Sequence, residues 1–304
     1  MSYEFLPQEN FLGLTEEQSA LESAGVIVLP IPYEGTVSYG GGTRFGPRSI
    51  VNASMQVELY DREFQREYGA EYGVHTLPPL AVNHASPEEM VRQIEEAVRD
   101  IASQYPDKLL FALGGEHSIS SGVGKGLAAA HDATRPLLVQ LDAHCDLRDE
   151  YEGTPYSHAS IARRLLESRW DIVQLGIRSL SMEEAELIQE RQHHLRVWFA
   201  EDVHRGSWQQ ELRQRVQGRD VFLSIDVDAF DPSLIPATGT PEPNGLSWLQ
   251  VLEIIGIVAD SAGRVLGVDC VELAPIPGHH ASEFIIAKLV YKTMNIVMDA
   301  RSRG

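Results

Sequence analysis

Cysteine is scarce in this sequence, which has only Cys145 and Cys270 among its 304 residues. Two cysteines are too few for a disulfide scaffold, and their scarcity indicates a reducing, cytoplasmic environment. The chain also lacks any run of about 18 apolar residues, so no membrane span is predicted. Met1–Leu12 lacks the basic segment followed by an apolar one that marks a signal peptide. We therefore expect a cytoplasmic protein with no membrane partner.

Basic residues are also few: 25 Lys and Arg stand against 44 Asp and Glu, for a net charge of −19. A nucleic-acid partner needs a basic face for the phosphate backbone, so this balance argues against one. A negative surface would attract a small cationic substrate, although solubility alone also explains the charge and bound metals would cancel part of it. Hydrophobic residues make up 43% of the chain, which is enough for a full core.

Strand and helix patterns alternate along the chain without a long linker or an internal repeat. Short apolar runs predict strands at residues 25–29, 108–113, 136–141, 172–176, 196–199, 221–228 and 265–273. Helical spacing and capping residues predict helices at residues 48–60, 87–104, 158–167, 181–193, 206–216, 247–260 and 281–299, while residues 61–85 look irregular. The alternation predicts one α/β domain over residues 1–304, with an open, mostly parallel sheet between two helical layers. Such sheets carry their sites at the C-terminal ends of the strands.

Acidic residues and a histidine follow two of the predicted strands at alternate positions. Asp142, His144 and Asp146 end one strand, and Asp226 and Asp228 end another. In an extended chain alternate residues point to one side, so each set can converge on one point. These groups repel each other unless cations lie between them, which predicts a metal site and, from the number of groups, two metals. Helix capping and surface charge are the structural alternative.

His117 is a sixth possible ligand, because the glycines of Gly114–Ser118 permit a tight turn that leaves it at a strand end. Four carboxylates and two imidazoles form a mostly hard-oxygen set, which suits Mn²⁺ better than a thiolate zinc site would; Ni²⁺, Co²⁺ and Zn²⁺ remain alternatives. Cys145 and Cys270 are expected to pack in the core. The glycine-rich loop at residues 30–47 has no Lys-Ser/Thr pair, so we expect a structural or substrate-rim loop rather than a nucleotide-binding one.

Two further residues admit both a structural and a functional interpretation. His158 lies in a loop after Asp146 and, as a lone loop histidine, would be unremarkable. Glu272 follows an apolar strand, and a carboxylate at such a strand end is either a cap or a cation-binding group. The residues alone leave both alternatives open.

Four motifs occur in order along the chain: GGEHS at 114–118, DAHCD at 142–146, SIDVDAFDP at 224–232 and DCVE at 269–272. With the loop at 39–47, YGGGTRFGP, they resemble the signatures of the ureohydrolase family, which contains arginases, agmatinases and formiminoglutamase. The resemblance spans nearly the entire chain, implies an arginase-like fold, and is closest to agmatinases through residues 146–153 and 156–160. Glu116 stands where many members have Asp, and Cys145 fills a variable position.

The resemblance implies a site with two Mn²⁺ per chain that hydrolyses a guanidinium group to urea and an amine. Carried over by motif, the ligands of one metal are His117 and Asp146, and those of the other are His144 and Asp228. The two bridging carboxylates are Asp142 and Asp226. Glu272 matches the family's guanidinium-binding carboxylate, and His158 matches the histidine that delivers a proton to the leaving amine. Asp226 or Asp228 could also accept a hydrogen bond from the attacking hydroxide, and Thr240 is a weaker candidate for substrate contact. The resemblance further suggests a homo-oligomer, a trimer or paired trimers.

The substrate prediction depends on the loop after the central motif. Asp149, Glu150 and Glu152 make this loop acidic, which favours an amine tail over a carboxylate tail, although simple solvation of an exposed loop explains the same residues. Agmatine, cleaved to putrescine and urea, fits best. Aminopropylagmatine, guanidinobutyrate and arginine are alternatives. A deacetylase of related fold or a non-catalytic member is less consistent with the full set of ligands together with His158 and Glu272.

Overall fold

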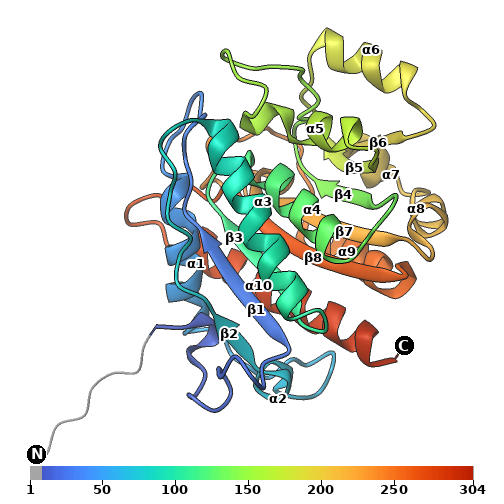
Figure 1. Ribbon diagram of the computed structural model, residues 1–304. Helices are drawn as coiled ribbons and strands as arrows, with labels where there is room; N and C mark the ends of the chain where they lie inside the picture. The colour runs from blue at the N-terminus through green and yellow to red at the C-terminus, as the bar shows by residue number, and fades with distance from the viewer. Residues whose placement is uncertain (1–8, 304) are drawn as a thin grey trace, which may run out of the picture.

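The computed structural model describes residues 9–303 and contains one sheet of eight parallel strands (Figure 1). The strands are β1 (Val26–Ile31), β2 (Val74–Thr76), β3 (Leu109–Gly114), β4 (Leu137–Leu141), β5 (Asp171–Ile177), β6 (Leu195–Phe199), β7 (Asp220–Asp226) and β8 (Arg264–Val271). Their order across the sheet is β2-β1-β3-β8-β7-β4-β5-β6. The predicted open parallel α/β sheet is therefore confirmed, and every strand pair in it is parallel.

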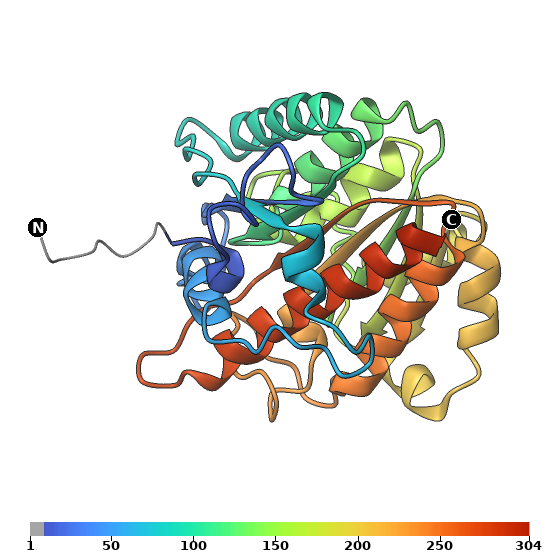
Figure 2. The ribbon, with the colours of Figure 1, turned by 90° about the horizontal axis from the view of Figure 1, so that it is seen from below.

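Helices cover both faces of the sheet, because the strands are apolar on both sides. Along β3, Leu109, Phe111 and Leu113 face one buried cluster, whereas Leu110 and Ala112 face the other. The helices are α1 (Gly46–Ser54), α2 (Tyr68–Tyr72), α3 (Pro87–Gln104), α4 (Ile119–Ala130), α5 (Ile161–Glu167), α6 (Met182–Glu190), α7 (Ala200–Arg205), α8 (Gln209–Val216), α9 (Trp248–Ser261) and α10 (Ala281–Arg303). Helices α3 to α6 pack on one face, and α1 with α7 to α10 pack on the other, which gives three layers (Figure 2).

The structure contains helix α7, which was not predicted, and it differs from the predicted elements in several other places. Residues 61–85, expected to be irregular, contain α2 and the short edge strand β2, whose three residues are too few to show a period. Helix α1 ends at Ser54 rather than at residue 60. The strand predicted at 221–228 ends at Asp226, and Val227–Ala229 form a 3₁₀ turn in which the Asp228 amide donates to the Asp226 side chain. The statement about Met1–Leu12 falls mainly on residues 1–8, which lie outside the described residues.

Four neighbouring strands in the middle of the sheet position the polar motifs. The order β3-β8-β7-β4 places the C-terminal ends of these strands side by side. Each is followed by one motif: His117 after β3, Glu272 after β8, Asp226 at the end of β7 and Asp142 after β4. Residues far apart in the sequence therefore meet at one edge, as expected of a parallel sheet.

A buried ion pair holds the segment before α2 against the C-terminal helix. The Lys292 ammonium lies 2.9 and 3.0 Å from the two carboxylate oxygens of Asp61, which also accepts a bond from Asn295. Burial alone would raise the pKa of Asp61, but the bonds from Lys292 and Asn295 outweigh it and the pKa is lowered from 3.8. The ionised carboxylate thus contributes stability above its ordinary pKa, and this contribution is lost as the pH falls through the lower, folded-state value.

Lys292→Met is expected to lower the free energy of unfolding by about 3 kcal/mol at pH 7, because it leaves Asp61 buried without its cation. Lys288→Met on the same helix removes only a lysine bonded to the Glu58 carbonyl and should cost less than about 1 kcal/mol. Urea unfolding at pH 7 and pH 3 measures both, and the Lys292 effect should shrink at pH 3. Equal effects of the two substitutions, or no dependence on pH, would rule out the ion pair as the cause.

Candidate metal centre

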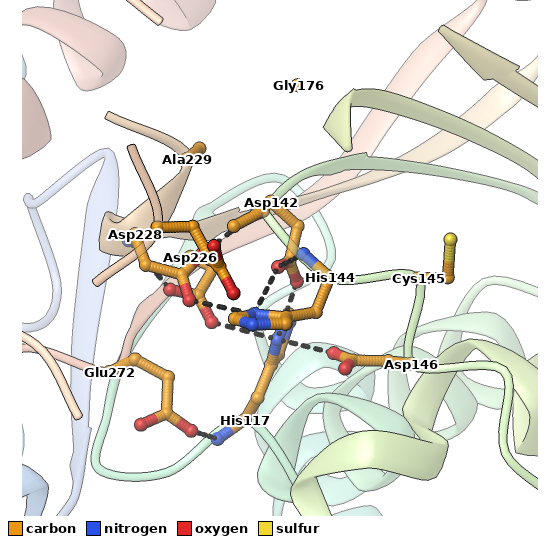
Figure 3. Close-up of polar contacts among 12 residues, drawn as sticks. His117, Asp142, His144, Cys145, Asp146, Gly176, Asp226, Asp228, Ala229 and Glu272 are labelled. Carbon is orange, nitrogen blue, oxygen red and sulfur yellow. Dashed lines mark hydrogen bonds and ion pairs between the residues drawn. The ribbon is translucent and has the colours of Figure 1, made fainter. Parts of the chain in front are cut away.

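The alternate spacing of the polar residues was interpreted on the assumption that the chain stays extended after β4. The structure instead turns sharply there. Strand β4 ends at Leu141, His144 bridges to Ser179 beside β5, and Asp146 has a left-handed φ of 50°. The three side chains nevertheless converge, as Figure 3 shows, while Cys145 points away into the core. The predicted convergence is therefore present, but a turn produces it. Asp146 in this conformation is uncommon, and Asp is one of the residues that tolerate it.

Two clusters of possible ligands share one carboxylate. The Nδ1 atom of His117 lies 3.1 Å from Asp142, 3.0 Å from Asp146 and 3.2 Å from Asp226. The Nδ1 atom of His144 lies 3.0 Å from Asp228 and 3.6 Å from Asp142. Groups of ligand atoms close enough to hold one ion are formed by His117, Asp142 and Asp226, and by Asp142, His144 and Asp228. Because Asp142 belongs to both, the arrangement fits two neighbouring cations.

The ring of His117 is oriented by Ser224 and Asp269, whose part in the site was not predicted from the sequence. The Ser224 hydroxyl donates to Asp269 at 2.7 Å, so the same oxygen is left to accept from Nε2–H of His117 at 2.9 Å. In the neutral ring the proton is then on Nε2, and the Nδ1 lone pair faces the three carboxylates. Nδ1 is buried and has no hydrogen-bond partner in the described part of the chain. An orphaned imidazole nitrogen aimed at carboxylates is what a metal ligand presents when seen without its ion.

A buried polar row lies beneath the site. Gln174, Gln140, Ser224 and Asp269 are register partners across β5, β4, β7 and β8. Gln174 donates to Gln140 at 2.8 Å, and Gln140 donates to Asp142 at 2.7 Å. The row thus supports the Asp142 carboxylate through Gln140 and the His117 ring through Ser224. The signal for two of them was present in the sequence, because Ser224 and Gln140 continue the alternate spacing of the two motifs by one step.

Protons must replace cations when the site holds no metal. Burial alone would lower the pKa of His117 and His144, but the facing carboxylates raise both, that of His144 to about 12. Burial and the neighbouring Asp142 raise the pKa of Asp146 to about 7, and burial with Asp228 raises that of Asp226 well above its usual range. Four carboxylates and two imidazoles thus form a donor set that fits a pair of divalent cations.

Metal binding should consequently release protons. Cations must displace the protons held by His117, His144 and Asp226, so apparent affinity should rise by at least about tenfold per pH unit between pH 6 and 8. Calorimetric titration of metal-free protein in two buffers of different ionisation enthalpy counts the protons released. Binding that is independent of pH, with no proton release, would contradict this cluster as the metal site.

Glu272 lies beside the cluster and belongs to neither ligand group. It is the first residue after β8, has a left-handed φ of 65°, and accepts a bond from the His117 amide at 2.6 Å (Figure 3). Burial, followed by Glu116 and Asp228, raises the pKa of Glu272 to about 8. Without a cation it is therefore mostly protonated at pH 7, and a bound cationic group favours its ionised form.

A cavity of about 200 Å³ opens over the cluster. This is less than the roughly 300–1,000 Å³ of pockets for drug-sized ligands, and it suits a small substrate. Most of the predicted site residues line it, namely His117, His144, Asp146, His158, Asp226, Asp228, Thr240 and Glu272. Asp142 is fully buried beneath them. The glycine-rich loop contributes residues 37–40 to the wall, with Gly40 packed against Gly239, which supports its interpretation as a substrate-rim loop.

Asp149 is placed differently from what the sequence suggested. Its carboxylate lies 2.8 Å from Arg164 of α5, its side chain is 62% exposed, and it is absent from the cavity wall. The same loop instead presents Arg148 and Tyr151 to the cavity, with the Arg148 guanidinium 5.0 Å from the Tyr151 ring centroid. A substrate contact by Asp149 therefore has no support in this geometry, because neighbouring loop residues point in different directions and the sequence does not show which one faces inward.

The fold and the site define a class of protein, namely a parallel α/β protein with candidate ligands for two metal ions at one buried point beneath a cavity. The Arginase family model matches residues 24–295. An N(1)-aminopropylagmatine ureohydrolase from Synechocystis is 37% identical over 92% of this chain and 91% of the relative, and an agmatinase from Bacillus cereus is 33% identical over 86% and 87%. The agmatine ureohydrolase structure from Thermoplasma volcanium superposes with a TM-score of 0.83 at 27% identity, covering 99% of this chain and 97% of that one.

The chain belongs to the arginase family, which confirms the resemblance and the arginase-like fold predicted from the four motifs. Proteins of this family depend on two metal ions, and the candidate ligand groups of this chain agree with that requirement. In the described residues no helix is long and apolar enough to cross a membrane.

Proposed function

We propose that the protein hydrolyses agmatine to putrescine and urea. The observation that carries the proposal is the meeting of six candidate ligands, Glu272 and His158 around one small cavity. Membership of the arginase family makes the protein a hydrolase of guanidino groups, and both kinds of relative named above act on substrates that contain agmatine.

The metal ions of the proposal are two Mn²⁺ per chain. His117 and Asp146 would hold one and His144 and Asp228 the other, with Asp142 and Asp226 between them. The hard-oxygen donors favour Mn²⁺ over the softer alternatives Ni²⁺, Co²⁺ and Zn²⁺. When bound, the two ions lower the pKa of water and so supply a nucleophile at neutral pH. The guanidinium carbon needs such help because its charge is spread over three nitrogens.

Glu272 would hold the substrate. Its carboxylate can pair with two nitrogens of the guanidinium group at once, and this charge-assisted contact fixes the guanidinium carbon over the ligand cluster. Asp228 also lines the cavity and would accept a hydrogen bond from the attacking water. Thr240 on the rim is the weakest candidate for a contact with the substrate tail.

His158 would move a proton from the attacking water to the leaving nitrogen. Hydrolysis turns the substituted nitrogen, which carries one hydrogen, into an ammonium that carries three, so both protons of the water end on that nitrogen. His158 lines the cavity, and the ring of Tyr151 packs against it edge-on at 5.6 Å. Burial, together with His117 and His144, lowers the pKa of His158, so its ring is neutral at pH 7 and can accept a proton before giving it up.

A second candidate substrate is aminopropylagmatine. Two relatives named for it are 37% identical to this chain, whereas the agmatinases from Bacillus cereus and Bacillus anthracis are 33% and 32% identical. Both substrates place the same guanidinium in the cavity and differ only in the tail, which must extend past Arg148 and the 37–40 loop. The acidic loop does not decide between them, because Asp149 faces Arg164.

Urea release measured side by side on manganese-loaded protein tests the proposal. The substrates are agmatine, aminopropylagmatine, arginine and guanidinobutyrate, the last included because Arg148 is a cation in the cavity wall. The highest kcat/KM is expected for agmatine. A higher value for aminopropylagmatine would move the assignment to the second candidate, and no urea from any of the four would contradict the proposed function.

We propose that residues 1–304 act as one ureohydrolase domain, supported by the single sheet of the described residues. The protein would work in the cytoplasm on a small cationic guanidino substrate. It would assemble as a trimer or as paired trimers, an expectation supported by family membership alone.

His158→Asn should lower kcat by about 10²-fold or more, which is the usual contribution of general acid–base catalysis, while metal content stays unchanged. Because His158 is needed neutral, the wild-type rate should fall as the pH drops through its lowered pKa, and this acid limb should vanish in the variant at saturating metal. The exposed His84 offers a control, His84→Asn, which should change neither. An unchanged rate and pH profile in His158→Asn would remove this residue from the mechanism.

A further inference from the structure

The hydroxyl of Thr36, in the loop after β1, makes three polar contacts with buried or half-buried groups. It donates to Glu116 Oε1 at 2.7 Å, accepts from the backbone amide of His158 at 3.0 Å, and lies 3.2 Å from His158 Nδ1. A hydroxyl has one hydrogen to give and two lone pairs with which to accept. These three contacts therefore use its full capacity.

Glu116 fixes which way the hydroxyl points. Its Oε2 accepts from the amides of Gly35 and Thr36, both at 2.7 Å, and its Oε1 accepts from the hydroxyls of Ser118 and Thr36. Each oxygen accepts two bonds, so the fully buried carboxylate acts only as an acceptor. The hydrogen of Thr36 then lies on the Glu116 side, and its oxygen presents lone pairs to His158.

Glycine makes the approach of these loops possible. A Cβ on Gly115 would lie 2.0 Å from the Tyr33 carbonyl oxygen, and the neighbouring Glu116 amide donates to that carbonyl at 2.9 Å. The loop after β3 is thereby held against the loop after β1, with the Glu116 side chain under Thr36. Three loops, those after β1, β3 and β4, meet at this single hydroxyl.

We propose that Thr36 and Glu116 are positioning residues that fix the tautomer of His158. With lone pairs facing it, Nδ1 of His158 must carry the ring hydrogen, and Nε2 keeps its lone pair. No protein partner of Nε2 is found within residues 9–303, and the ring lines the cavity, so Nε2 is the nitrogen left for the substrate. The inference deepens the proposed function and rests on it for its chemistry.

The fixed tautomer allows one ring nitrogen to take up and return the same proton. Nε2 accepts a proton from the attacking water, and the ring becomes a cation whose two N–H groups face Thr36 and the cavity. Nε2–H then donates its proton to the leaving nitrogen as the C–N bond breaks, which restores the neutral ring with its hydrogen on Nδ1. The second proton of the water can follow the same route through Nε2, so that both end on the leaving nitrogen. The opposite tautomer would present an N–H to the cavity from the start and could accept nothing.

The tautomer can be observed directly by nitrogen NMR of the histidine rings. Protein with ¹⁵N-labelled histidine is loaded with diamagnetic Zn²⁺, and the His158 signal is identified by its absence from His158→Asn. We expect hydrogen on Nδ1 and a bare Nε2, which is the less favoured form of imidazole in water. A hydrogen on Nε2 in the wild type overturns the proposal, and this measurement requires neither the folding of any Thr36 variant nor any activity.

Variants separate positioning from general support of the loop. Thr36→Val should lower kcat by about tenfold or more, which is part of the roughly 10²- to 10⁴-fold that proton transfer contributes to a rate. KM should stay within about twofold of the wild-type value, and the His158 ring should become a mixture of its two tautomers. Thr36→Ser should restore both. Thr43→Val removes another buried hydroxyl of the same loop, bonded to Glu34 at 3.2 Å, and should leave kcat and tautomer unchanged.

Equal losses of kcat in Thr36→Val and Thr43→Val, or an unchanged tautomer in Thr36→Val, would show a merely structural role and overturn the proposal. Failure of the proposed function has a different signature, because wild-type protein would then release no urea from any guanidino compound while the tautomer stayed measurable.

Discussion

Glu272→Gln is expected to lower kcat/KM for agmatine by at least about thirtyfold. Removing one partner of a charge pair in a partly dry site costs on the order of 2–5 kcal/mol of interaction free energy, and each 1.36 kcal/mol corresponds to about tenfold in rate. Glutamine keeps the shape and the acceptor oxygen that bonds the His117 amide, but it cannot carry the negative charge that pairs with a guanidinium. Metal content should stay near normal, because Glu272 belongs to neither ligand group.

The competing interpretation is that Glu272 only caps the end of β8. It predicts a small change in stability and nearly intact turnover. Kinetics on folded, metal-replete Glu272→Gln, with Glu183→Gln on the exposed side of α6 as a control for the chemical change, separate the two. Wild-type turnover in the Glu272 variant would show that this carboxylate does not hold the guanidinium group of the substrate.

Asp142→Asn is expected to weaken the binding of both metals by more than about 100-fold. Removal of a residue that only supports a metal ligand already costs up to about 100-fold in metal affinity, and the loss of a direct ligand should cost more. Among residues 9–303, Asp142 is the one carboxylate that lies near both histidines, 3.1 Å from His117 and 3.6 Å from His144, so it would face both ions. Asp146→Asn should instead deplete the His117 side in preference to the other, because Asp146 contacts His117 alone of the two histidines.

The matched control for these variants is Asp149→Asn. It changes an acid of the same loop that pairs with Arg164 outside the cavity, so metal content and turnover should stay within about twofold of wild type. Elemental analysis after gel filtration gives the metal content per chain. Two tightly held metals in Asp142→Asn would contradict its place between the ions.

Much of the fold follows from the sequence, because its strands are apolar on both faces and alternate with capped helices. The Ser86 cap of α3 and the run ending at Leu141 are examples in which local chemistry decides the element. The edge strand β2 was not predicted, because Val74–Thr76 is held by pairing to β1 rather than by any pattern of its own. The early end of α1 was not predicted, because helix ends leave weak signals in a sequence.

The site was predictable as a set of residues and less so as a geometry. Alternate spacing identified Asp142, His144 and Asp146, yet the left-handed turn at Asp146 brings them together, and no spacing rule shows such a turn. Thr36 contacts His158 from a different loop, and Asp269 orients His117 through Ser224 of the neighbouring strand. Only the folded chain reveals these contacts. The loop after β4 shows the limit most clearly, since Arg148 faces the cavity and its neighbour Asp149 does not.

The central claim is that one buried cluster holds two metal ions and that these ions enable hydrolysis of a guanidinium group. The most direct test is to titrate metal-free protein with Mn²⁺ while following urea release from saturating agmatine and bound metal in the same samples. Urea release is expected to rise to a plateau at two Mn²⁺ per chain, and Asp142→Asn should show neither the plateau nor the stoichiometry. Full activity in the metal-free protein, or a plateau with no more than one ion bound per chain, would contradict it.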